Sequence, residues 1–587
     1  MREIKTSKHL VKVQGGEDLN IQLVNEHLED GLDIVKLKIT SEVPTNMPMI
    51  ALSWQESIVD IHSYWHPTSF RNKGLHADWA GGFFSKATIS APVSCLFNVK
   101  GENRHTCAYS DALHPVNINI GVHEEDGTFK CQVVLFTEPS KNIQEYEGEL
   151  RIDTRSLPYH QCLKEVSAWW ENMEQYKPAF VPEAAKEPMY STWYSFHQEI
   201  TEDEIEKQCS LAKDIGCETV IVDDGWQTTD NNRGYAFCGD WKVAKERIKD
   251  MKDHVKRVHA MGLKYILWYS VPFVGLYSEA WHKFKDCLLS YNEHLKAGVL
   301  DPRYPEVREY LISTYENAVK EWDLDGLKLD FVDEFDLPRM GDDKYNEKMD
   351  FESVQEAVHC LLSTIMETLR NIKPDFMIEF RQRYIGPYMR QYGNMFRVTD
   401  CPNDTITNRI GSMDIRLLCG NTAAHADPLM WNVQDTIENV ALQFINTLFA
   451  VPQLSMKIDA LTETHFKTCK FWLNFWKEHR DVLLQGELTP FHPELNYPLI
   501  ISSTLKECLI AVYSDFIVPL SLEENKKVIL VNGTFNNKIY VDVHDNYNER
   551  QLEVLNCSGE VIITKTITLN KGITVIEIPP CGVAYLI

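Results

Sequence analysis

The chain has 587 residues, of which 44% are hydrophobic and 11% aromatic, a composition typical of a globular protein with roughly two to four domains and not of a disordered one. Its formal charge of −26 disfavours nucleic acid and anionic membrane surfaces as partners, because both attract an excess of Lys and Arg. The polar opening Met1–His9 lacks the apolar core of a signal peptide, and no apolar run is long enough to span a bilayer. We therefore expect a cytoplasmic protein.

Residues 1–165 alternate apolar and polar side chains between frequent turn signals, for example at 32–39, 93–99 and 131–136. This pattern predicts an N-terminal β-sandwich. Within it, the aromatic cluster Ser63–Pro67 is either a packing feature or a loop that reaches across a domain boundary to stack on a sugar.

A helical stretch around 163–176 and a segment rich in Pro and Ala end the first domain, so we predict a helical linker over 166–188. From 189 to 487, short apolar segments alternate with amphipathic helical ones, which favours a (β/α)₈ TIM barrel. An open doubly wound sheet would usually carry a Gly-rich turn after its first strand. The predicted strands are 190–196, 219–223, 264–270, 327–332, 376–380, 395–399, 422–426 and 453–456.

Residues 488–587 return to β character, with candidate strands at 499–503, 508–513, 527–531, 539–543 and 575–579. They predict a small C-terminal β-sandwich in which no group of residues indicates chemistry.

Polar residues collect where the predicted barrel strands end, at Asp223-Asp224, Lys328-x-Asp330, 379–383, 397–400 and His425-x-Asp427. A single acidic strand end could cap the next helix. Five of them together indicate an active site, since barrel enzymes carry their reactive groups at the carboxyl ends of the strands.

The segment 325–331 holds the most informative pair. Lys328 and Asp330 lie two residues apart in an apolar strand, so they share one face, and burying them without partners would cost several kcal/mol. A cation beside Asp330 would keep the carboxylate ionised, as a nucleophile requires. The alternative is a structural ion pair at a strand end.

The fifteen cysteines form no CxxC pair or Cys/His cluster, and no Gly-rich phosphate loop is present. We therefore expect no disulfide framework, no metal and no cofactor, and most cysteines as small buried residues. Carboxylates, a lysine, guanidinium groups and tryptophans suit a carbohydrate site instead, with two carboxylates available for glycoside chemistry.

An ordered set of motifs carries a family resemblance. Its members are Val222-Asp223-Asp224-Gly225-Trp226, Gly239-Asp240-Trp241, the run from Gly262 through Trp268 to Pro272, Asp301–Val307, Lys328-Leu329-Asp330 and Arg397–Asp404. In order and spacing they resemble the α-galactosidases and raffinose synthases of glycoside hydrolase family thirty-six. The resemblance implies a central barrel with flanking β domains.

By position, the resemblance implies that Asp330 is the nucleophile of a retaining reaction and that Asp400 is the acid/base. It also implies a pocket for the terminal sugar, in which Asp223 and Asp224 bind O4 and O6. The remaining predicted substrate-binding residues are Trp226, Asp240, Trp241, Trp268, Lys328, Arg381, Arg397 and Asp404. Asp404 is also a rival for the acid/base role. For proton donation we expect Asp400 to titrate high while Asp330 stays ionised.

The chain departs from many relatives after the fifth strand, where Arg381 and Arg383 stand in place of a Cys and a Gly-rich run. This change leaves open a 2-acetamido sugar, a branched oligosaccharide or an anionic substituent beside simple galactose.

We predict hydrolysis of terminal α-linked galactose, or of a galacto-configured sugar, from oligosaccharides or glycoconjugates. The alternatives are an α-N-acetylgalactosaminidase or a transglycosidase on the same scaffold, a noncatalytic sugar-binding barrel and, last, an aldolase or lyase that uses Lys328 as a Schiff base. Self-association into a homo-oligomer is compatible with the sequence.

Overall fold

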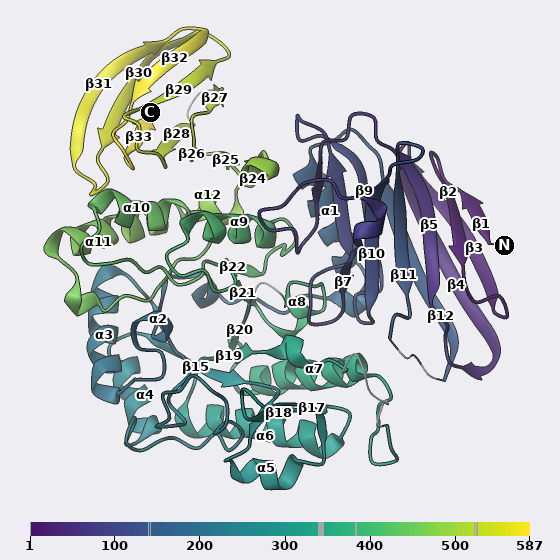
Figure 1. Cartoon of the computed structure of the whole chain (residues 1–587). Coiled ribbons are helices and arrows are strands. Elements are labelled where there is room, and N and C mark those ends of the chain that lie inside the picture. The colour runs from purple at the N-terminus through teal and green to yellow at the C-terminus, as the bar shows by residue number, and fades with distance from the viewer. Residues whose placement is uncertain are drawn as a thin grey trace.

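The computed structural model describes residues 2–587 except 139, 141, 338–344, 382, 383, 522, 524 and 525. Figure 1 shows the chain running from a purple β domain through a central barrel to a yellow β domain. This architecture confirms the predicted TIM barrel between two β domains.

Two six-stranded sheets form the N-terminal domain and enclose a hydrophobic core between them. Strand β2 (Leu10–Gln14) and strand β11 (Thr128–Leu135) bury every second residue, as expected where one face of a sheet covers a core. The first sheet also contains β1 (Glu3–Lys5), β5 (Ile50–Ser57), β10 (Val116–His123) and β7 (Phe83–Ser85). The second contains β3 (Asn20–Glu29), β4 (Leu32–Thr45), β12 (Ile143–Asp153), β9 (Asn103–Tyr109), β8 (Val93–Phe97) and β6 (Ser63–Trp65).

Eight parallel strands form the barrel, in the chain order predicted from the sequence. They are β13 (Met189–Ser191), β14 (Thr219–Val222), β15 (Lys264–Ser270), β19 (Gly326–Asp330), β20 (Met377–Arg381), β21 (Met395–Arg397), β22 (Ala423–His425) and β23 (Gln453–Leu454). β13 pairs with β23, and the parallel bridge from His425 to Val451 brings β22 to the same segment, so the sheet closes on itself.

Several helices around the barrel begin at a side chain that caps their first turn. Thr201, Asp250, Ser353, Thr436 and Thr462 each accept a hydrogen bond from a backbone N–H of the first turn. The longer helices are α3 (Glu202–Ile215), α4 (Met251–Ala260), α6 (Pro305–Trp322), α7 (Val354–Ile372), α9 (Thr405–Arg416), α10 (Ile437–Ile445) and α11 (Glu463–Glu478).

The first barrel strand is shorter than predicted. It ends at Ser191, and the aromatic residues expected to continue it form the short helix α2 (Trp193–Phe196). The loop after β23 stabilises this helix. The Ser455 hydroxyl accepts a hydrogen bond from the Tyr194 backbone N–H at 2.9 Å, and the Ser455 carbonyl accepts one from the Ser195 hydroxyl at 2.7 Å. Tertiary contacts therefore override the strand preference of Trp, Tyr and Phe.

The C-terminal domain contains a seven-stranded and a three-stranded sheet around its own core. The first is made of β24 (Glu487–Phe491), β25 (Leu499–Ser503), β26 (Glu507–Val512), β28 (Lys527–Asn532), β33 (Val583–Leu586), β30 (Tyr547–Leu555) and β31 (Val561–Leu569). The second is made of β27 (Ile517–Leu520), β29 (Lys538–Val543) and β32 (Gly572–Glu577).

A buried carboxylate connects all three parts of the chain. Asp414 of α9 accepts hydrogen bonds from Trp65 at 3.0 Å and Tyr497 at 2.6 Å, and it lies 3.3 Å from the Lys73 ammonium. Trp65 is completely buried. The predicted aromatic cluster therefore does reach across the domain boundary, but its tryptophan packs there and is not exposed to a sugar.

Helix α1 (Tyr159–Glu171) also contacts several parts of the chain, since Trp170 donates to the Tyr109 carbonyl and Tyr159 to the Pro490 carbonyl. The domain boundaries at 165, 188 and 487 stay a proposal. All fifteen cysteines are free thiols, and all except Cys360 and Cys508 are buried, as expected. None of the described helices has the length and hydropathy needed to cross a membrane.

Candidate active site

The barrel interior changes from apolar to polar along its strands. Its amino end is filled by a buried cluster that includes Met189, Ile221, Ile266, Met377, Met395 and Ala423. Because side chains alternate between the two faces of a strand, the residue two positions further on points into the same interior. Those residues are Ser191, Asp223, Trp268, Glu379, Arg397 and His425. The carboxyl ends of the strands therefore carry a polar layer, where barrel enzymes have their active sites.

Asp330 ends β19 and is almost completely buried. Its Oδ2 accepts a hydrogen bond from the Trp268 indole at 3.1 Å, while Oδ1 accepts one from the Phe331 backbone N–H at 2.9 Å and lies 2.7 Å from Arg381 Nε. Burial raises the pKa of Asp330, but the charges of Arg381 and Lys328 and the Trp268 hydrogen bond lower it further, so the net pKa lies below its usual value. Asp330 is therefore ionised, as a nucleophile must be.

The cation that pairs directly with Asp330 is not the predicted one. Lys328 Nζ donates to Asp223 Oδ2 at 2.6 Å, and Arg381 from the neighbouring strand forms the ion pair with Asp330. Lys328 does share the pocket and still lowers the pKa of Asp330 through its charge. Side-chain length explains the difference, since the extended lysine passes the short aspartate two residues away and reaches β14.

Asp223 and Asp224 form a buried pair in which the two carboxylates have different partners. Asp223 pairs with Lys328, whereas Asp224 accepts hydrogen bonds from Gln198 at 2.8 Å and Gln227 at 2.7 Å. Burial raises the pKa of Asp224 to about 7, and the charge of Asp223 adds to the rise against the two amide hydrogen bonds. Near neutral pH a substantial fraction of Asp224 is thus protonated and able to donate a hydrogen bond to a ligand.

Arg397 lies among three carboxyl groups on the opposite side of the pocket. It donates to Asp400 at 2.9 Å, is bound to Asp427, and lies 3.7 Å from Glu379. Arg397 is buried, while the Asp400 side chain is 42% exposed. Asp400 therefore faces the open part of the site, and Arg397 holds it from the inside.

The expectation that Asp400 titrates high is wrong. Burial raises its pKa, but the charges of Arg397, Lys328 and Arg381 outweigh burial and lower the pKa to about 2. Asp427 behaves in the opposite way, because complete burial raises its pKa to about 6 despite the opposing charge of Arg397. The sequence motif could not reveal the difference between the two pKa values, because it depends on how Arg397 contacts carboxyl groups that follow or belong to three different strands.

Three residues predicted to bind the sugar also have partners within the protein, and their role stays a prediction. The Trp226 ring is fully buried, donates to the Trp268 carbonyl at 2.9 Å and stacks on Trp241 at 6.0 Å. Trp241 is itself almost completely buried. Asp240 accepts from the backbone N–H groups of Glu279 and Ala280 at the start of α5 (Glu279–Phe284).

Asp404 also forms contacts that stabilise the fold. It caps α9 by accepting from the Thr407 backbone N–H at 3.0 Å and forms an ion pair with Arg71 of the N-terminal domain at 2.7 Å. Both contacts direct its carboxylate away from a catalytic role and favour Asp400 over this rival. Arg383, the other guanidinium proposed to meet an anionic substituent, lies outside the described residues.

The structure adds residues that the sequence did not single out. Tyr384 hydrogen bonds with Arg381, Phe331 and Asp333, and Tyr194 donates to Asp427 at 2.9 Å. The third addition, Gln198, binds Asp224. Asp427 could have been found from its position at a strand end. Tyr194 lies in the short helix α2, and Gln198 and Tyr384 lie in connections between barrel elements, and none of the three belongs to a chemical motif.

Several aromatic rings lie beside Asp330, the predicted nucleophile. Tyr235 stacks on Phe273 at 5.0 Å and on Trp268 at 6.4 Å, and it meets Phe331 edge-on at 5.0 Å. Aromatic faces of this kind pack against the apolar face of a sugar ring. Of the predicted tryptophans, Trp268 is the one that contacts both these rings and Asp330.

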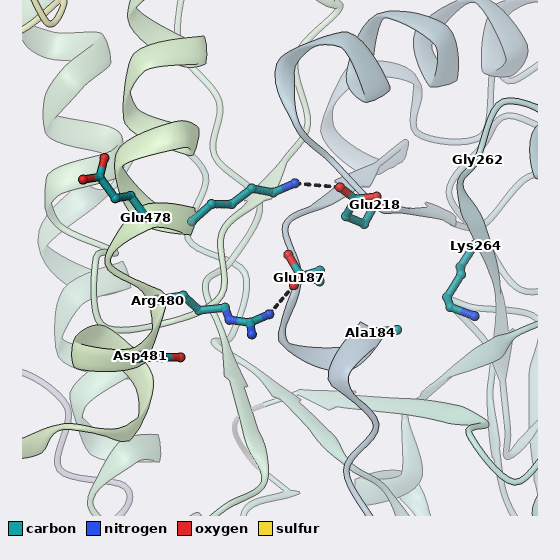
Figure 2. Close-up of a pocket in the computed structure, with 9 residues that line it drawn as sticks. Ala184, Glu187, Glu218, Gly262, Lys264, Glu478, Arg480 and Asp481 are labelled. Atoms are coloured by element: carbon teal, nitrogen blue, oxygen red, sulfur yellow. Dashed lines mark hydrogen bonds and ion pairs between the residues drawn. The ribbon is translucent and has the colours of Figure 1, made fainter.

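A cavity lies at the other end of the barrel. It has a volume of about 640 Å³ and is lined by residues preceding β13, β14 and β15 and by the end of α11. Two ion pairs lie at this cavity. One joins Lys477 to Glu218 at 2.6 Å, and the other joins Arg480 to Glu187, both labelled in Figure 2. Because its charged groups pair with one another at the amino ends of the strands, we assign it a structural role.

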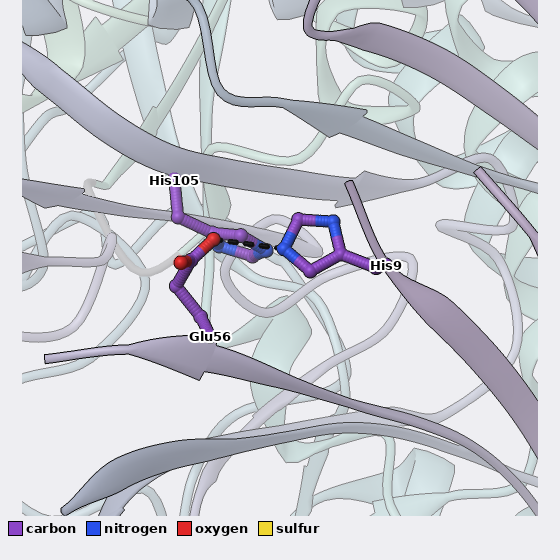
Figure 3. A group of neighbouring side chains, drawn as sticks. All are labelled: His9, Glu56 and His105. Atoms are coloured by element: carbon purple, nitrogen blue, oxygen red, sulfur yellow. Dashed lines mark hydrogen bonds and ion pairs between the residues drawn. The ribbon is translucent and has the colours of Figure 1, made fainter. Parts of the chain in front are cut away.

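Among the described residues, one group has the side chains of a metal site. His9, Glu56 and His105 of the N-terminal domain lie together in Figure 3, with ligand atoms within 4.8 Å of one another. The Trp54 indole donates to His105 Nε2 at 2.8 Å, and burial lowers the pKa of His105 to about 4. An indole can only donate, so the proton of this neutral ring lies on Nδ1 and neither nitrogen offers a lone pair to a cation. We therefore assign the cluster to packing.

Fold and site together define a three-part (β/α)₈-barrel protein with a carboxylate-lined pocket at the carboxyl ends of its strands. Residues 159–383 match the family model named Melibiase. The solved structure of the GH36 α-galactosidase AgaA from Geobacillus stearothermophilus, as a variant in complex with 1-deoxygalactonojirimycin, is similar with a TM-score of 0.64. It is 15% identical, and the match covers 98% of this chain and 83% of that one.

Two curated proteins are similar in sequence. The α-galactosidase Mel36A of Lactobacillus acidophilus is 24% identical over 289 residues, which is 46% of this chain and 36% of that protein. AgaA of Geobacillus stearothermophilus is 24% identical over 217 residues, 36% of this chain and 28% of its own length. The matches thus span about a third of these relatives. The predicted resemblance to the α-galactosidases is confirmed in sequence over residues 159–383, and the fold of the chain is similar to that of solved α-galactosidases of glycoside hydrolase family 36.

Proposed function

We propose that the protein is a retaining α-glycosidase that removes terminal α-linked galactose, or another galacto-configured sugar, from oligosaccharides or glycoconjugates. The observation that carries the proposal is Asp330, a buried carboxylate held ionised at the end of β19. Asp400 across the pocket is partly exposed and free to meet a leaving group or water. The similarity to α-galactosidases supports the substrate class.

The reaction has two steps. Asp330 attacks the anomeric carbon while Asp400 donates a proton to the departing glycosidic oxygen, which gives a covalent glycosyl-enzyme. Water then attacks the same carbon as Asp400 removes its proton, and the sugar is released with its configuration retained. The low pKa of Asp400 keeps it ionised for its role as base and leaves a small protonated fraction for its role as acid.

Sugar selection is proposed for the side of the pocket formed by Asp223 and Asp224. A galacto-configured sugar satisfies both groups through O4 and O6, whereas an epimer leaves a buried polar group unpaired at a cost of about 1–3 kcal/mol. A variant of AgaA from Geobacillus stearothermophilus has been solved with raffinose, an oligosaccharide ligand in keeping with this assignment. The proposed natural substrate is an oligosaccharide or a glycoconjugate. Transfer of the sugar to an acceptor is the alternative to hydrolysis at the same site.

A panel of nitrophenyl α-galactoside, α-N-acetylgalactosaminide and α-glucoside tests the proposal. We expect at least a roughly tenfold to hundredfold higher kcat/KM for a galacto-configured substrate than for the glucoside. Asp330→Ala should nearly abolish turnover without unfolding the protein, because it removes the covalent step. Asp404→Ala serves as the matched control, since it removes a nearby carboxylate that caps a helix. Preference for the glucoside would refute the sugar assignment, and a fully active Asp330→Ala would refute the nucleophile.

A further inference from the structure

The two oxygens of the Asp330 carboxylate have different surroundings. Oδ1 accepts the Phe331 N–H and lies against Arg381, while Oδ2 has the Trp268 indole as its partner. Each carboxylate oxygen offers two lone-pair directions. Oδ1 therefore has one hydrogen bond and a guanidinium against it, whereas Oδ2 has one hydrogen bond and is the more open oxygen for the anomeric carbon.

The backbone after Asp330 maintains this asymmetry. Phe331 has a φ of 63°, a left-handed conformation that is uncommon for a bulky aromatic residue. Its N–H points back to Oδ1 and is shared with the Tyr384 hydroxyl at 3.1 Å. A strained conformation beside a reacting group persists only where the surrounding contacts hold it.

Arg381 is fixed at Oδ1 by its own contacts. Its Nη2 donates to the Tyr384 hydroxyl at 2.9 Å, and that hydroxyl donates to Asp333 at 2.8 Å. The guanidinium also lies over the Phe331 ring, 5.0 Å from its centre. The Tyr384 hydroxyl thus donates to Asp333 and accepts from Arg381 and from the Phe331 N–H, so all of its hydrogen-bonding positions are occupied. This network holds the guanidinium in one defined position.

We propose that Arg381 is a positioning residue that makes Asp330 a good leaving group in the second half of the reaction. The inference rests on the proposed glycosidase function. In the first step the bond from Oδ2 to C1 forms, the bond from C1 to the glycosidic oxygen breaks, and that oxygen takes a proton from Asp400. In the second step the water oxygen binds C1, Asp400 takes the water proton, and the C1–Oδ2 bond breaks with its electron pair returning to Asp330.

Arg381 affects the two steps differently because of charge. It interacts weakly with the neutral ester of the intermediate and strongly with the carboxylate that departs from it, so it stabilises the second transition state. The same ion pair stabilises the free carboxylate before the first step and does not favour attack. Removing the charge should therefore slow release of the sugar more than its attachment.

Pre-steady-state kinetics of Arg381→Gln on the nitrophenyl glycoside preferred by the wild type tests this inference. We expect a burst of nitrophenol approaching one equivalent per site, with kcat lower by roughly ten- to a hundredfold and KM lower as well, because the intermediate accumulates. Mass spectrometry of the quenched protein should show the attached sugar. Arg381→Lys should restore part of the second step, and Tyr384→Phe, which only loosens the guanidinium, should change kcat in the same direction by less.

Trp268→Phe is the matched comparison, since it removes the contact at the attacking Oδ2. It should lower kcat/KM without a burst. Arg381→Gln and Tyr384→Phe variants that turn over without a burst, or that lose kcat/KM at unchanged kcat, would overturn the inference while the glycosidase proposal stands. A wild type without turnover on any sugar of the panel would overturn the glycosidase proposal itself.

Discussion

At the scale of single residues, the charge of Arg397 decides how Asp400 behaves. Its guanidinium holds the pKa of Asp400 at about 2, so the protonated fraction of this group falls about tenfold with each pH unit above that value. Proton donation then limits substrates whose leaving groups need it, while activated aryl glycosides do not depend on it.

We therefore predict two different pH profiles. On an unactivated galacto-configured disaccharide, log kcat/KM should fall by about one unit per pH unit as the pH rises through the acidic and neutral range. On the nitrophenyl glycoside, log kcat/KM should lack this fall, because its leaving group departs without a proton from Asp400. With Asp400→Ala, added azide should restore part of the rate on the activated substrate. A disaccharide profile that is flat up to pH 7 would contradict the low pKa.

At the scale of elements, α9 begins at the site and extends into the interface between domains. Its N-cap, Asp404, lies four residues after the proposed acid/base and is bound to Thr407 and Arg71. The Arg71 pair is about half exposed and contributes little to stability. The cap itself is worth about 0.5–2 kcal/mol.

For Asp404→Ala we expect a lower midpoint of thermal unfolding and a kcat within a few-fold of the wild type, with no response to azide. Differential scanning fluorimetry and steady-state kinetics on the nitrophenyl glycoside measure the two effects. If kcat instead falls more than a hundredfold and azide restores it, Asp404 and not Asp400 is the acid/base.

At the scale of the whole molecule, Asp414 is the carboxylate that joins the barrel to both β domains. Lys73 has no exposed side-chain surface, and without Asp414 its buried charge keeps only the Phe70 carbonyl as a described partner. Burial lowers the pKa of Lys73 against the opposing charge of Asp414. Removing one partner of a buried ion pair typically costs about 3–5 kcal/mol.

Asp414→Ala should therefore lower the unfolding temperature clearly and separate the unfolding of the N-terminal domain from that of the barrel in scanning calorimetry. The double variant Asp414→Ala/Lys73→Met should recover part of the loss, because no unpaired charge remains. Lys242→Ala, which breaks the exposed ion pair with Glu279, is the control and should melt like the wild type. A single unshifted transition in Asp414→Ala would show that this contact does not couple the domains.

The sequence by itself determined the order of elements and the set of polar strand ends. Both follow from local patterns: apolar periodicity specifies the barrel strands, and residues such as Asp330 and Asp400 end strands in motifs that keep their spacing in the chain. The extent of β13 was less predictable, because a serine from the loop after β23 turns the aromatic residues into a helix.

The tertiary structure alone decided which charges meet. Lys328 bonds to Asp223 on another strand, Arg381 reaches Asp330, and Arg397 divides its charge among three carboxyl groups. Tyr384 and Gln198 enter the site from loops. Ion pairs and pKa values depend on distances across strands and on burial, both of which are set by packing between segments far apart in the chain. For that reason the sequence could propose the role of Asp400 but could not predict its low pKa.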